Sequence, residues 1–129
     1  MTKKPHEDWF YLVHEDLAFA KAGLRDGFYA HVCFLSQQAV EKAMKGYLIS
    51  IGKTHPKTHG LMTLLGLMDA DWMEEYLSAI KKLSAFYIPL RYPDAMAGSL
   101  PEGLPDKKTA TDVLQWANDI VKKIESHLT

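Results

Sequence analysis

Basic side chains gather in one stretch of the sequence that holds no acidic residue. No Asp or Glu occurs between residues 43 and 68. The stretch and the position before it carry four lysines, Lys42, Lys45, Lys53 and Lys57. Lysine ammonium groups are point-charge donors for phosphate, and the free N–H groups at a helix start favour anions. The pattern indicates a local phosphate-binding patch; the alternative is a solvated surface balanced by nearby acids, Asp69, Asp71, Glu74 and Glu75.

Two histidines in this stretch have the spacing of zinc ligands. His55 and His59 are four residues apart, which places two imidazoles on one face of a helix. Pro56 disfavours helix geometry at His55, and the loop offers no carboxylate as a third ligand. We therefore expect no metal site and no cofactor, and we expect His59 to contact the basic patch from the start of a helix.

The single cysteine does not fit a catalytic pair. Because Cys33 is the only cysteine, the chain can form neither an internal disulfide nor a metal site with several thiolates. His31 cannot activate it, because residues two apart on a helix point about 200° apart. We predict that Cys33 is a buried thiol of the core. The glycines are isolated and form no phosphate-binding loop or dinucleotide fingerprint.

A second group of chemically capable residues is the run Arg91-Tyr92-Pro93-Asp94. A guanidinium can bind phosphate through two parallel hydrogen bonds, and a tyrosine ring can stack on a base. An equally good interpretation is an ion pair between Arg91 and Asp94 that closes a turn. The residues alone leave both interpretations open.

The elements that must position these residues are helical. Apolar residues recur at intervals of three and four, which predicts an all-α, up-and-down bundle of four to five helices in one domain, residues 1–129. We expect helices over about 5–22, 29–51, 59–68, 71–88 and 107–127, with Gly23 as the first stop and an Asp71–Glu74 capping box. Residues 91–105 hold three prolines and two glycines and should form an irregular surface loop.

The second predicted helix is apolar over more than half of its circumference, so it needs neighbours on several sides. Its expected inward residues are Phe28, Val32, Cys33, Leu35, Ala39, Val40, Ala43, Met44, Tyr47 and Ile51. The remaining arc carries the polar residues His31, Gln37, Gln38, Glu41, Lys42 and Lys45, with Phe34 and Ile49 among them.

Composition sets broad limits. The chain has 129 residues, of which 47% are hydrophobic and 24% charged, the profile of one globular domain. A net charge of −1 provides no strong field toward nucleic acid or an anionic membrane, so any such binding must be local. No apolar run approaches the roughly 20 residues of a membrane span, and the first residues lack a signal-peptide core. We expect a cytoplasmic protein that does not enter membranes.

Three motifs occur in one order along the chain. They are Phe34-Leu35-Ser36-Gln37-Gln38-Ala39-Val40-Glu41-Lys42-Ala43-Met44-Lys45, then Pro56-Lys57-Thr58-His59-Gly60-Leu61, then Arg91-Tyr92-Pro93-Asp94. This combination resembles the HEPN family (higher eukaryotes and prokaryotes nucleotide-binding domain). The resemblance implies a helical bundle related to the substrate-binding helical domain of kanamycin nucleotidyltransferase, and commonly a homodimer. It also implies a minimal nucleotidyltransferase as the partner in a two-component, toxin–antitoxin-like system.

The sequence departs from the ribonuclease motif of that family, in which an Arg is followed after four to six residues by a His. After Arg91 the corresponding positions hold Met96, Ala97 and Gly98, and the next histidine is His127. Without an imidazole there is no ordinary acid or base for the ribose 2′-hydroxyl. We therefore expect a non-catalytic protein that binds a nucleotide, or the substrate of its nucleotidyltransferase partner, with RNA as a further candidate ligand. The expected contact residues are Gln38, Lys42, Lys45, His59, Arg91, Tyr92 and Asp94.

Two other functions remain open at this point. One is a metal-independent endoribonuclease toxin that uses Arg91 with a displaced histidine, His59 or His31. The other is a protein-interaction scaffold without a small ligand, in which the surface around Phe34 and Ile49 contacts a second copy or a partner protein.

Overall fold

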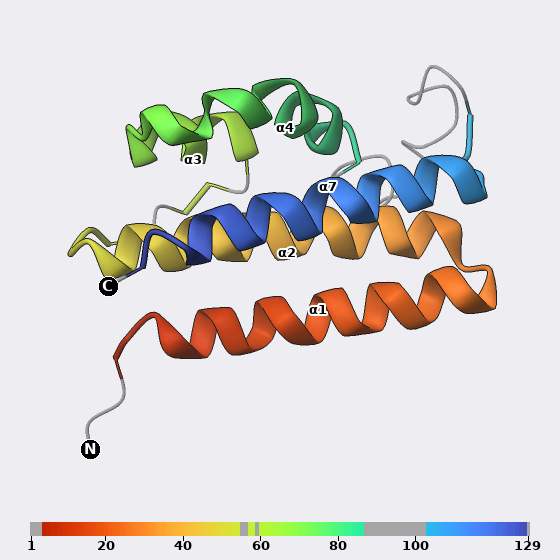
Figure 1. The fold of residues 1–129 in the computed structure, drawn as a ribbon, viewed down its shortest axis with the longest axis horizontal. Coiled ribbons are helices and arrows are strands. Elements are labelled where there is room, and N and C mark those ends of the chain that lie inside the picture. The colour runs from red at the N-terminus through yellow and green to blue at the C-terminus, as the bar shows by residue number, and fades with distance from the viewer. Residues whose placement is uncertain (1–3, 55–56, 59, 87–102, 129) are drawn as a thin grey trace.

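The structure is a computed structural model, and it describes residues 4–54, 57–58, 60–86 and 103–128. Over these residues it is all-helical and contains no strand, as the apolar periodicity predicts. Its elements are α1 (Glu7–Asp26), α2 (Tyr29–Ser50), α3 (Leu61–Met68), the 3-10 helix η1 (Asp71–Tyr76), α4 (Leu77–Ser84) and α7 (Lys107–Glu125). Figure 1 shows the long helices α1, α2 and α7 running side by side, with the shorter α3 and α4 crossing above them.

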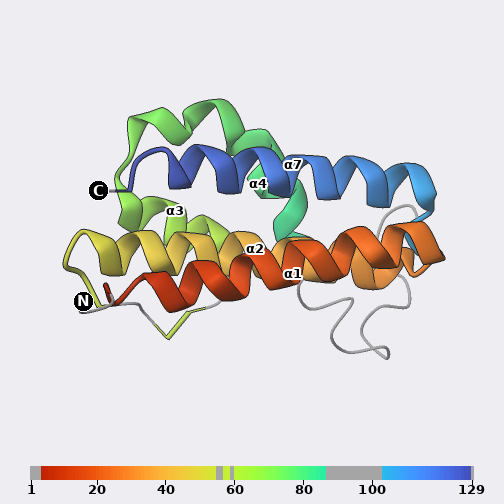
Figure 2. The same ribbon diagram turned by 60° about the horizontal axis from the view of Figure 1, so that its bottom comes forward.

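The central element is α2, which contacts α1, α7, α3 and α4. Turning the molecule by 60° shows α1 and α2 together on one side of α7 (Figure 2). The largest fully buried apolar side chains come from all of these elements: Val13, Val32, Met44, Leu48, Leu61, Leu64, Met73, Ile80, Leu83, Ile120 and Ile124. The prediction that the second helix needs neighbours on several sides is therefore confirmed.

The prediction that this helix buries ten residues is wrong at two of them. Phe28 is 60% exposed and Ile51 is 45% exposed. Both are cap residues that flank α2 and lie outside it, where the chain turns away from the core. The predicted burial is confirmed at six positions, Val32, Cys33, Ala39, Val40, Ala43 and Met44, while Leu35 and Tyr47 are half-buried and pack against the core.

The end of α1 differs from the predicted one. The helix continues past Gly23 to Asp26, and Gly27 is the cap residue with φ of 88°. This left-handed conformation has no steric penalty for glycine. Gly27 donates its N–H to the carbonyl of Gly23, which closes the last turn. Gly23 is thus a buried residue within the helix and does not end it.

The predicted fourth helix is divided in two. Residues 71–76 form the 3-10 helix η1, and α4 follows from Leu77; the cap residue of η1 is Ala70, and Asp71 makes no capping box. In a 3-10 helix, residues three apart lie on one side. Met73 and Tyr76 thereby both face the core, while Glu74 and Glu75 are exposed. The expected end of this helix near Pro89 lies outside the described residues.

Side-chain contacts stabilise both ends of α7. Asp106 Oδ1 accepts a hydrogen bond from the N–H of Thr109 at 2.8 Å, a side-chain N-cap for α7. The helix ends at Glu125, two residues earlier than predicted, and the imidazole of His127 beyond it stacks on the ring of Trp72 with centroids 3.8 Å apart. This stack joins the end of α7 to η1.

Within the described ranges, none of the helices combines the length and the apolar character that crossing a bilayer would require.

The helices α1 and α2 approach each other closely at Gly46. A Cβ atom at this position would lie 2.7 Å from Phe10 Cε2 and 3.1 Å from Trp9 Cβ. Gly66 in α3 is a matched contrast, because a Cβ there would have no atom within 4 Å.

We expect Gly46→Ala to lower the free energy of unfolding by about 1–3 kcal/mol, because α1 must move away from α2. Gly66→Ala should raise it by up to about 1 kcal/mol, since alanine has the higher helix propensity. Urea denaturation followed by circular dichroism measures both. Equal effects of the two substitutions would contradict the close contact.

Candidate functional site

The seven predicted site residues divide into two groups. Gln38, Lys42 and Lys45 lie on α2 and are described. The other four, His59, Arg91, Tyr92 and Asp94, lie outside the described residues. Their convergence with the lysines of α2 therefore stays a prediction.

Gln38, Lys42 and Lys45 share one side of α2. Their spacing of four and three residues places them one above another along the helix. Gln38 is half-buried, the Lys42 side chain is 27% exposed, and the Lys45 side chain is 6% exposed. Access to this side therefore decreases from Lys42 to Lys45. Phe34 and Ile49, the expected contact surface, are both half-buried.

The ammonium group of Lys42 is paired with a carboxylate of another helix. Lys42 Nζ donates to Asp16 Oδ2 of α1 at 2.6 Å, and the Asp16 side chain is 17% exposed. Asp16 lies 26 positions earlier in the sequence, so an acid-free stretch of sequence is not an acid-free region of space. Because α1 packs antiparallel on α2, the pair lies across the helix contact.

The second ion pair is within α2 and is buried. Lys45 Nζ donates to Glu41 Oε2 at 3.0 Å, and each side chain is 6% exposed. Buried charges are tolerated when they are paired, but the loss of hydration can exceed the attraction within the pair, so such a pair contributes little net stability. The spacing of four residues was visible in the sequence, but the burial of both partners depends on packing that the sequence pattern does not specify.

Buried polar groups continue along this part of α2. Gln38 Nε2 donates to Gln37 Oε1 at 2.8 Å, and Gln37 is fully buried. The Gln37 amide nitrogen and the Ser36 hydroxyl have no hydrogen-bond partner in the part of the chain that the structure describes. Each such group costs about 1–3 kcal/mol of stability. A helix segment that retains such groups is therefore a candidate for function. The sequence pattern predicted Gln37 on the polar arc of the helix, but it did not indicate that this residue is buried.

Among the described histidines, His31 is on the same side of α2 as Gln38. It lies seven residues earlier, about 10 Å along the helix, and is exposed. The others are engaged elsewhere: His6 packs edge-on against Phe10, His14 bonds to Glu125, and His127 stacks on Trp72.

The thiol of Cys33 is unreactive by its environment. The residue is buried, and burial raises its pKa to about 12, with a smaller contribution from the negative charge of Asp106. A thiol that stays protonated is a poor nucleophile, which confirms the prediction of a core residue. No cluster of three or more potential metal ligands occurs among the described side chains.

Removing one member of the buried ion pair should be costly. We expect Lys45→Met to lower the free energy of unfolding by about 3–5 kcal/mol, because Glu41 keeps a buried charge. The double variant Glu41→Leu/Lys45→Met should recover most of that loss. Chemical denaturation measures both. Lys108→Ala, which breaks the exposed pair with Asp112, is the control and should have little effect. A Lys45→Met protein as stable as this control would rule out the buried pair.

Comparison with known structures supports the whole fold. The chain is similar to TT1696 from Thermus thermophilus, with a TM-score of 0.84, 32% identity, and coverage of 98% of this chain and 100% of that one. It is also similar to ST0689, described as an archaeal HEPN homologue, with a TM-score of 0.78, 30% identity and the same coverages.

Sequence comparison extends the likeness to a protein from Methanocaldococcus jannaschii named "Putative toxin MJ1304". The alignment is 124 positions long at 30% identity, and it covers 88% of this chain and 82% of the relative. The family model described as "HEPN domain" matches residues 6–127, nearly all of the described bundle. This chain is therefore a member of the HEPN domain family.

Proposed function

We propose that this chain is the HEPN component of a toxin–antitoxin-type pair and that it acts by binding, without cleaving RNA. The toxin name of the Methanocaldococcus relative supports the type of system. The absence of histidine four to six residues after Arg91 supports binding over cleavage, because general acid–base catalysis needs a titratable group at the reacting hydroxyl.

The proposed ligand is a nucleotide or another phosphate-bearing molecule, bound against the side of α2 that carries Gln38 and Lys42. The observation that carries this proposal is the Lys42 ammonium, which is held in place 2.6 Å from Asp16 and is still partly exposed. A phosphate would compete with that carboxylate for the same cation. Lys45 is nearly inaccessible against Glu41, so Lys42 contributes more to binding.

The residues beyond α2 complete this proposal. Arg91 would clamp the phosphate, Tyr92 would stack on a base, and His59 and Asp94 would contact the same ligand. A homodimer in the cytoplasm, with a minimal nucleotidyltransferase as partner, is the assembly that we propose from the family membership.

Titration calorimetry with nucleoside triphosphates tests the ligand. Lys42→Ala should weaken binding about tenfold, because one charge-assisted contact to phosphate is lost. Asp16→Asn keeps the shape of the side chain but frees the ammonium, so it should tighten binding several-fold. Arg91→Ala should weaken binding as Lys42→Ala does.

Lys81→Ala, on the exposed surface of α4, is the control and should bind as the unaltered chain does. Absence of binding for every nucleotide would eliminate the nucleotide proposal. Binding that does not respond to Asp16→Asn would place the ligand away from Lys42.

One observation favours ribonuclease activity as the second candidate: His31 is exposed on the side of α2 that carries Gln38 and Lys42. We expect RNA to remain intact when incubated with the purified protein in EDTA. If cleavage is seen and is lost in His31→Ala but kept in His14→Ala, a displaced histidine is the catalyst and the binding-only proposal is wrong. His14 is the matched control because it is also exposed but bonds to Glu125.

A further inference from the structure

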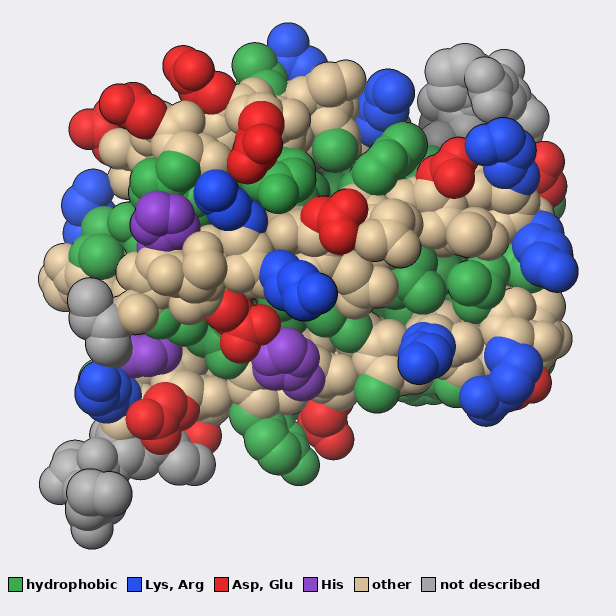
Figure 3. Space-filling view, viewed as in Figure 1, with side chains coloured by type: hydrophobic (Ala, Val, Ile, Leu, Met, Phe, Trp, Pro, Cys, Tyr) green, Lys and Arg blue, Asp and Glu red, His purple; other side chains and the backbone are tan. Residues whose placement is uncertain are grey.

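A groove between α1 and α7 has no part in the proposed ligand site. It encloses about 680 Å³, and all of its lining residues are described. Five apolar side chains line it: the exposed Ala18, the half-buried pair Leu17 and Leu24 of α1, and the pair Leu114 and Val121 of α7, which are 6% and 2% exposed. In each pair the residues are seven apart, which is two helical turns, so the apolar lining runs along both helices. Figure 3 shows this face, with hydrophobic patches between basic side chains.

Of the charged side chains that line the groove, the acidic ones have partners within the described chain and the lysines do not. His14 Nε2 and Glu125 Oε2 lie 3.0 Å apart and connect α1 to α7 at one end. Asp119 Oδ1 accepts a hydrogen bond from Gln115 Nε2 at 2.9 Å. Both carboxylates of the groove therefore have partners. The two lysines, Lys21 on α1 and Lys122 on α7, are exposed, and their ammonium groups make no ion pair or hydrogen bond within the described part of the chain.

We propose that this groove binds an amphipathic α-helix of a partner protein, with apolar residues on the inner face and acidic residues on both flanks. Each wall offers one of these two lysines, so a carboxylate on either flank of the incoming helix would meet a cation. From His14 to Leu24 the groove extends about 15 Å, the length of three helical turns.

The groove suits a helical occupant because of the backbone of its two walls. The backbone N–H and C=O groups of α1 and α7 are used within their own helices, so the groove offers no backbone partners to an extended peptide. A helix satisfies its own backbone groups and buries only side chains. A second copy of this chain fits less well, because a two-fold contact through this groove would bring the lysines of both copies together.

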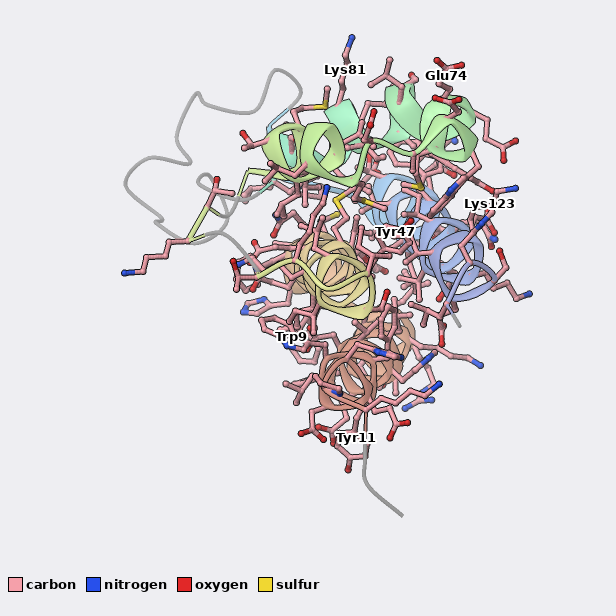
Figure 4. All side chains as sticks on the ribbon, turned by 90° about the vertical axis from the view of Figure 1, so that its left-hand side faces the viewer. Trp9, Tyr11, Tyr47, Glu74, Lys81 and Lys123 are labelled. Carbon is pink, nitrogen blue, oxygen red and sulfur yellow. The ribbon has the colours of Figure 1, made fainter. Side chains whose placement is uncertain are left out.

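This surface is separate from the proposed ligand site. His14, which lines the groove, and Asp16, which pairs with Lys42, are two residues apart on α1 and point about 200° apart. The end-on view in Figure 4 shows α1 below α2 and α7 to one side, with Tyr11 pointing away from the bundle. Failure of nucleotide binding would therefore leave this inference standing, and the reverse is also true.

Two synthetic peptides test the inference. Each has about 15 residues, which as a helix is about one turn longer than the groove. Both carry leucine at every third or fourth position; one has glutamate on its flanks and the other has lysine. Fluorescence anisotropy with labelled peptides should give about fivefold to tenfold tighter binding of the glutamate peptide, the effect of two exposed ion pairs. Amide NMR shifts should change along α1 and α7.

The variant Lys21→Glu/Lys122→Glu should reverse the preference between the peptides. Lys57→Glu/Lys81→Glu is the matched control: it changes the net charge by the same amount at exposed positions outside the groove, and it should keep the preference. Ala18→Trp, which fills the groove, should abolish binding of both peptides.

Equal affinity for the two peptides, or a preference that survives Lys21→Glu/Lys122→Glu, would overturn the proposal. Self-association that this variant alone abolishes would identify a second copy as the occupant and would equally overturn it. Circular dichroism confirms that each variant is folded before its binding is measured.

Discussion

The contact between α1 and α2 determines the arrangement of charges in this molecule. Gly46 lets Phe10 and Trp9 approach the backbone of α2, and the antiparallel pairing that follows brings Asp16 beside Lys42. A lysine that appears unbalanced in the sequence is thereby neutralised from another helix. The character of the α2 surface is set by how closely two helices pack, and only secondarily by which residues α2 itself contains.

Much of the fold could be predicted from the sequence, because apolar spacing reports helices directly. The boundaries of α2 agree with the predicted ones to within a residue at its end. The segment beginning at Asp71 could not be predicted correctly, since its geometry is decided by the burial of Met73 and the Trp72–His127 stack. These contacts lie between segments far apart in the chain, where local propensity carries no information.

The candidate site shows the same division between local and long-range information. The shared side of Gln38 and Lys42 follows from helical spacing alone. The pairing of Lys42 with Asp16 and the burial of Glu41 with Lys45 do not, because both depend on which helix covers which face. The four remaining predicted residues, among them Arg91 and Tyr92, lie outside the described residues, so this part of the site rests on the family motifs.

The position of Cys33 limits the kinds of contact that this HEPN protein can make with another molecule. It is the only cysteine in the chain, and it lies in the central helix with its thiol shielded from solvent. A folded copy therefore presents no sulfur for an intermolecular disulfide. Any complex that this chain forms through its folded surface is therefore held by noncovalent contacts, and it should dissociate and re-form without a reductant, whatever the redox state of its surroundings.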